Sequence, residues 1–146
     1  MRSLTKSFCL LACVMASTGA GAEQWFAVQS PGEHSARTAV EVDLDSIRAR
    51  GQVGETVIRV TYESPQQHPS NFVFRSVVAT AQFDCQRRAI SLISGAYFAE
   101  PQGNGLRLGA ESSGHASGMP ELLLRSIPPP TLHALLRATC ATTQTP

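Results

Sequence analysis

The residues of this 146-residue chain that could carry out chemistry are four cysteines, four histidines and one close pair of aspartates. Four cysteines could form two disulfides or a metal site with four ligands. No two histidines have the H-x-x-x-H or H-E-x-x-H spacing of a zinc site. We therefore predict no metal site, and we expect each histidine to be solvated, three in loops and one in a short helix: His34, His68, His115 and His133.

Asp43, Asp45 and Ser46 stand at the end of a predicted strand. Two carboxylates can divide acid and base roles only when their surroundings separate their pKa values. At a strand end, Asp and Ser more often bind the backbone of the turn itself, and we favour that interpretation. The chain has no G-x-S-x-G, P-loop or G-x-G-x-x-G motif, and Gly103-Asn104-Gly105 is interpreted as a turn. The sequence therefore nominates no catalytic residue and no cofactor, and we predict that the protein is not an enzyme.

Arg87 and Arg88, beside Cys85, are the only adjacent basic pair. They could bind an anion or be solvated at the tip of a hairpin, and we favour the second. Apolar residues make up 42% of the chain and charged residues 16%, which is typical of a folded domain and not of a disordered one. The formal net charge of +1 gives no long-range field for nucleic acid, so no nucleic-acid partner is predicted.

Residues 1–22 have the layout of a secretory signal peptide. Arg2 and Lys6 precede a nine-residue apolar stretch, Phe8–Ala16, and Ala20-Gly21-Ala22 fits the cleavage pattern, so we expect cleavage after Ala22. Nine apolar residues are too few to span about 30 Å of hydrocarbon, and no later stretch is long enough for a transmembrane helix. A second processing route remains open, because Leu10-Leu11-Ala12-Cys13 fits a lipobox in which Cys13 would be lipidated.

Removal of residues 1–22 would leave a single domain, residues 23–146, with a formal net charge of −1, because Arg2 and Lys6 are lost. Two cysteines, Cys85 and Cys140, then remain, which excludes a metal site made of four cysteines. In an oxidising compartment we favour a disulfide between them. The alternative is a pair of reactive thiols, although no C-x-x-C motif is present.

Alternation of apolar and polar residues dominates the rest of the chain and predicts strands. We expect six of them, at residues 24–30, 38–43, 55–62, 72–85, 88–98 and 105–110. Residues 45–51 and 64–71 are predicted to form a turn and a polar loop. After Pro128–Pro130, which we interpret as extended, Thr131 fits an N-cap and residues 131–139 a short helix. The predicted fold class is therefore α+β, an antiparallel sheet of about six strands with a C-terminal helix packed on one face and a single disulfide.

Successive side chains of a strand point to opposite faces of the sheet, and this alternation predicts which residues form the core. In residues 72–85 it places Phe74 and Val78 on one face and Val77, Ala79 and Phe83 on the other. We interpret Gly95 as a bulge. The predicted core consists of Trp25, Ala27, Val40, Val42, Ile47, Ile58, Val60, Phe74, Val78, Phe83, Ile90, Leu92, Leu132, Leu135 and Leu136.

Several landmarks follow one another in an order that resembles the bacterial surface-adhesin protein E family. They are Trp25, the VEVDLDSIRARG stretch at residues 40–51, the strand Ile58–Tyr62, the FDCQRR stretch at residues 83–88, Tyr97 and Cys140. The resemblance covers nearly all of the chain after residue 22. It implies an antiparallel sheet backed by a helix, with the two cysteines paired.

The resemblance also implies an exported domain of a Gram-negative bacterium, in the periplasm or at the cell surface, that adheres to host matrix or plasma proteins. Binding could use a sheet face, a loop or a strand edge, and an edge could also pair with a second copy to give a homodimer. Two alternatives stay open at this point, a periplasmic structural protein of the cell envelope without a host ligand and a small hydrolase.

Overall fold

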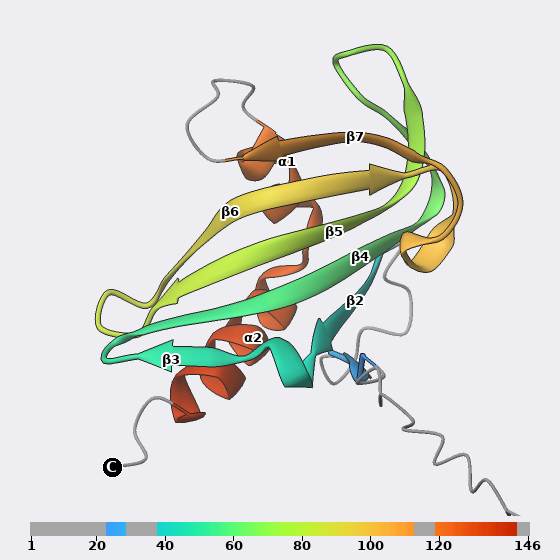
Figure 1. Ribbon diagram of the computed structural model, residues 1–146. Helices are drawn as coiled ribbons and strands as arrows, with labels where there is room; N and C mark the ends of the chain where they lie inside the picture. Colours follow the sequence, from blue (N-terminus) through green and yellow to red (C-terminus); the bar gives the residue numbers. More distant parts are fainter. Residues whose placement is uncertain (1–22, 29–37, 113–118, 143–146) are drawn as a thin grey trace, which may run out of the picture.

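The computed structural model describes residues 23–28, 38–112 and 119–142 (Figure 1). Its strands are β1 (Trp25–Ala27), β2 (Thr38–Asp43), β3 (Arg48–Arg50), β4 (Val53–Gln67), β5 (Val73–Asp84), β6 (Ala89–Phe98) and β7 (Arg107–Ser112). Its helices are the short 3₁₀ turns η1 (Leu44–Ser46) and η2 (Pro101–Gly103), followed by α1 (Met119–Ser126) and α2 (Pro129–Thr142).

All seven strands form one antiparallel sheet in the order β1-β2-β4-β5-β6-β7, with β3 paired to the first residues of β4. Helices α1 and α2 both lie on one face of this sheet, as Figure 1 shows. The predicted fold class is therefore confirmed. The sequence missed β3, because the run Arg48-Ala49-Arg50 is exposed along its whole length and carries no apolar alternation.

The core lies between the helical face of the sheet and the two helices. Alternate residues of β4 and β5 are buried there, including Ile58, Val60 and Phe83, each at most 1% exposed. Tyr62, Val77, Ala79, Ala81, Tyr97, Leu123 and Ile127 are core residues that the sequence analysis did not include.

Four of the predicted core residues are placed differently, and one of them, Ile47, is only half-buried and lies outside the core cluster. Val78 lies on the opposite face, because the irregular pairing between Phe74 and Ser76 changes the alternation, so that Phe74 shares its face with Val77. Trp25 is half-buried and Ala27 exposed, since β1 lies at the edge of the sheet.

The hairpin of β4 and β5 is longer than predicted, because β4 continues through residues 64–67, which were expected to be a loop. Thr61 pairs with Ser76 and Gln66 pairs with Phe74, so three extra residues of β4 are accommodated between these pairs. Pro65 lies in this irregular stretch, where its missing N–H costs no regular ladder bond. In β6 the extra residue is Ile93 and not Gly95, which pairs normally with Ala79.

The C-terminal region contains two helices where one was predicted. Helix α2 begins at Pro129, two residues before the expected N-cap, and Thr131 is buried inside it. The first turn of a helix needs no backbone donors, so prolines fit there, and the Leu132 N–H still bonds to the Pro128 carbonyl at 3.1 Å. The sequence analysis missed α1, which follows a stretch rich in Gly and Ser.

Candidate functional site

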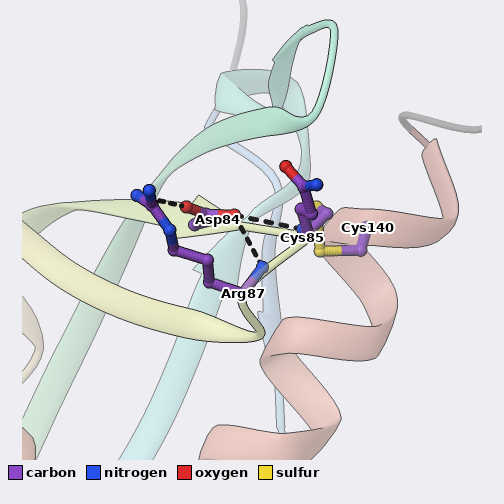
Figure 2. The surroundings of a disulfide bond; sticks show 5 residues. Asp84, Cys85, Arg87 and Cys140 are labelled. Carbon is purple, nitrogen blue, oxygen red and sulfur yellow. Dashed lines mark hydrogen bonds and ion pairs between the residues drawn. A yellow bond between two sulfur atoms is a disulfide. The ribbon is translucent and has the colours of Figure 1, made fainter.

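The predicted disulfide joins Cys85 to Cys140 across 55 residues of sequence, with the two Cα atoms 5.5 Å apart. Cys85 follows β5 directly and Cys140 lies near the end of α2, so the bond ties the helix to the turn between β5 and β6 (Figure 2). The disulfide supports the sheet–helix packing. Cys13, the alternative lipidation site, lies outside the described residues.

The turn between β5 and β6 holds the basic pair in a solvated position, as predicted. One carboxylate oxygen of Asp84 accepts the backbone N–H groups of Gln86 and Arg87 at 3.1 and 2.8 Å. The Arg87 side chain is 83% exposed and approaches the other Asp84 oxygen at 3.5 Å (Figure 2). The Asp84 carboxylate therefore offsets the charge of Arg87 within the turn itself.

Asp43 and Ser46 satisfy the backbone of the turn after β2, as the favoured interpretation predicted. The Asp43 side chain accepts the Asp45 N–H at 3.1 Å, and the Ser46 hydroxyl donates to the Asp43 carbonyl at 2.7 Å. The same hydroxyl oxygen accepts the Val57 N–H at 2.7 Å and so fastens this turn to β4. The side chains of Asp43 and Ser46 therefore serve to hold the backbone of the turn and of β4.

The histidines are not all solvated. His133 on α2 is exposed, whereas His68 is only 3% exposed and packs among aromatic rings, so the prediction of a solvated loop was wrong for His68. The reason is the extended hairpin, which folds the predicted loop back onto the sheet. His34 and His115 lie outside the described residues. Within the described ranges, no group of three or more His, Cys, Asp or Glu side chains could hold a metal ion.

Strand β1 presents an open backbone edge. The Val28 N–H donates to the Val40 carbonyl at 2.8 Å and the Leu44 N–H donates to the Gln24 carbonyl at 3.0 Å. Residues 24, 26 and 28 therefore direct their backbone groups toward β2, and those of Trp25 and Ala27 point the other way. Among the described strands, none pairs with that outer side of β1.

Trp25 anchors this edge strand on the face of the sheet opposite the helices. Its ring lies 4.2 Å from the guanidinium carbon of Arg59, a cation–π contact. Arg59 in turn makes a two-pronged ion pair with Glu41, at 2.8 and 2.7 Å. This contact adds to the backbone pairing that joins β1 to β2.

On the helical face, an apolar groove of about 540 Å³ separates β1 from α2. Phe26 and Leu44 project at its rim with 60% and 44% of their surfaces exposed. The groove is lined by Phe26, Ala27, Val28, Val42, Leu44, Ile47, Ala134, Leu135, Ala138 and Thr139, none of which carries a charge. The sequence analysis did not nominate Phe26 or Leu44; their signal is a large apolar residue in a strand or turn at the sheet edge.

The opposite edge strand, β7, has a different character. It carries Arg107, and Glu111 points inward to accept a hydrogen bond from the Tyr97 hydroxyl at 3.1 Å. Inward-facing charges are a common protection of sheet edges against further pairing. β1 has no charged residue, so it is the less protected of the two edges.

A second cavity, of about 270 Å³, lies between the β4–β5 hairpin and α1. Its walls are mainly apolar, and the Tyr62 and Ser126 hydroxyls meet there at 3.0 Å. Burial raises the pKa of Tyr62 above its ordinary value of 10.0. It is lined by Tyr62, Gln66, Gln67, Phe74, Val77, Tyr97, Leu123, Arg125 and Ser126.

No helix in the described ranges is both long and apolar enough to cross a bilayer. Among curated proteins, none matches this chain. Solved structures of Haemophilus influenzae protein E resemble it. One crystal form is 18% identical, with 73% of this chain and 83% of that chain covered and a TM-score of 0.49. Another, from a non-typeable strain, is 14% identical over 80% and 99%, with a TM-score of 0.40.

The model of the surface-adhesin protein E family matches residues 25–141, from β1 to the end of α2. This match covers most of the chain and includes both cysteines of the disulfide. The resemblance inferred from the order of short motifs is thereby confirmed. The chain belongs to the surface-adhesin protein E family.

Proposed function

We propose that this protein is an exported, non-enzymatic adhesin that binds host matrix or plasma proteins through the β1 edge and the apolar groove beside it. Membership of the surface-adhesin protein E family supports the adhesin role. The observation that carries the choice of surface is the open backbone of Trp25 and Ala27 next to the exposed Phe26 side chain. In this proposal residues 1–22 are the export signal and residues 23–146 the binding domain.

An extended segment of a partner could add to the sheet at this edge. The outward N–H and C=O groups of Trp25 and Ala27 would supply main-chain hydrogen bonds, and alternate partner side chains would enter the groove. The groove is uncharged and apolar, so it would favour segments with apolar residues at alternate positions. Such recognition would depend on the alternation of apolar side chains and not on one particular sequence.

Binding of the processed full-length protein to a panel of immobilised matrix and plasma proteins tests this proposal. Ala27→Pro removes an outward N–H without touching the bonds to β2, and an edge strand tolerates proline. We expect this variant and Phe26→Ser to weaken binding at least tenfold. Leu106→Ser is the matched control, because Leu106 is 71% exposed but lies in the stretch between η2 and β7.

Unchanged binding by both β1 variants, with the wild-type protein binding well, would show that the partner uses another surface. No binding to any protein of the panel would instead favour the periplasmic structural role. Circular dichroism and urea unfolding of each variant establish that the fold is retained.

A further inference from the structure

His68 is a buried ionisable side chain at a surface turn, remote from the proposed β1 site. It lies just after β4, where its imidazole stacks on Phe72 at 4.2 Å with the two planes 8° apart. The edge of the ring also meets Tyr97, whose ring centre is 4.7 Å away. The imidazole thus links the turn of the β4–β5 hairpin to β6.

The two ring nitrogens of His68 have different neighbours. The Ser70 backbone N–H donates to Nδ1 at 3.0 Å, so Nδ1 carries no proton in this arrangement. The neutral ring therefore has its proton on Nε2. Nε2 lies 3.3 Å from Oε1 of Glu111, without the alignment of a good hydrogen bond. The other Glu111 oxygen accepts the Tyr97 hydroxyl.

From this geometry we infer that protonation of His68 switches the turn at residues 68–72 between two contacts, one to Ser70 within the hairpin and one to Glu111 of edge strand β7. We call this turn the latch. A second proton on His68 can bind only at Nδ1, where it would oppose the Ser70 N–H. Protonation and the Ser70 hydrogen bond therefore exclude each other. The same proton turns the contact of Nε2 with Glu111 into an ion pair, so acidification releases Ser70 while it tightens the connection to β7.

The groups that face the His68 ring determine whether the Ser70 hydrogen bond or the ion pair with Glu111 is favoured. Glu111 from β7 is the charged group that faces it, and the Tyr97 hydroxyl from β6 is held by the same carboxylate. From β5 and the turn, the ring meets the uncharged Phe72 and Phe74. Arg125 of α1 lines the cavity on which Tyr97 also borders. The Glu111 carboxylate is the counter-charge with which an imidazolium at this position would pair. Histidine side chains ordinarily change charge between pH 5 and 8, so this is the pH range to examine.

Nuclear magnetic resonance on the processed full-length protein between pH 8 and pH 5 tests the latch. The hydrogen-exchange protection of the Ser70 amide should fall at least tenfold, with the same midpoint as the His68 ring signals. The Cys85 amide, bonded to the Gln52 carbonyl at 2.9 Å far from the turn, should keep its protection.

Two variants distinguish this pH-dependent exchange from a purely structural role of His68. Glu111→Gln should move the Ser70 midpoint to lower pH, because the imidazolium loses its counter-charge. His133→Gln, which removes an exposed histidine, should leave the Ser70 response unchanged. A Ser70 amide that stays protected while His68 titrates would overturn the inference. The inference would also be overturned if Glu111→Gln left the midpoint of the Ser70 response unchanged, or if the His68 ring signals did not change between pH 5 and 8.

Discussion

Removal of the Cys85–Cys140 disulfide should cost this domain a large part of its stability. The bond closes a loop of 55 residues, and the chain-entropy relation gives about 4 kcal/mol for a loop of that length at 25 °C. Small domains have total unfolding free energies of about 5–15 kcal/mol, so this loss is a substantial fraction. Because the bond holds the end of α2 against the turn after β5, the helix should detach first.

Urea unfolding of the Cys85→Ala/Cys140→Ala protein measures this loss. With a urea dependence of about 1.5 kcal/mol per M, the midpoint should fall by about 3 M. Wild-type protein in a reducing agent should show the same fall, and the double variant should not respond to the reductant. A loss below about 1 kcal/mol, or a reductant effect on the double variant, would refute the reasoning.

Three further predictions concern the turn after β2, the buried Tyr97 and export. Ser46→Ala should cost about 1–3 kcal/mol, because the Val57 N–H loses its acceptor; equal urea midpoints for variant and wild type would contradict this. Burial, reinforced by Glu111, raises the pKa of Tyr97 above its ordinary value, so the unfolded state loses this proton first as pH rises. The unfolding free energy of the wild type should therefore decline above about pH 10, and Tyr97→Phe should lessen the decline. Identical profiles of unfolding free energy for the two proteins from pH 8 to 12 would contradict this prediction. The mass of the exported protein should correspond to cleavage after Ala22; incorporation of a palmitate analogue that Cys13→Ser abolishes would instead establish lipidation.

The parts of the fold that could be predicted are those with an unambiguous local pattern. Strand β2 was predicted at its exact bounds, because Val40 and Val42 alternate with polar residues over one half-buried strand. The turn role of Asp43 and Ser46 followed from the same logic, since their side chains bond within a few residues of themselves. The disulfide could be predicted because the proposed export signal removes the other two cysteines.

The remaining features depend on contacts between residues far apart in the sequence. Parity failed in β5 because irregular pairing near Ser76 moved Val77 into the core, and no local signal marks that irregularity. His68 appeared to be a loop residue because its burial depends on Tyr97 of β6 and on Glu111 of β7. The groove beside Phe26 is formed only when α2 packs near β1, so the sequence could not show it.

Surface exposure on intact cells tests the adhesin proposal most directly, because an adhesin must be reachable from outside. Antibodies raised against the folded domain, together with externally added protease, should detect and cleave the protein on intact cells that produce it. A protein of the periplasm would serve as the internal control and should stay protected. If this protein is equally protected until the outer membrane is opened, the adhesin proposal is contradicted.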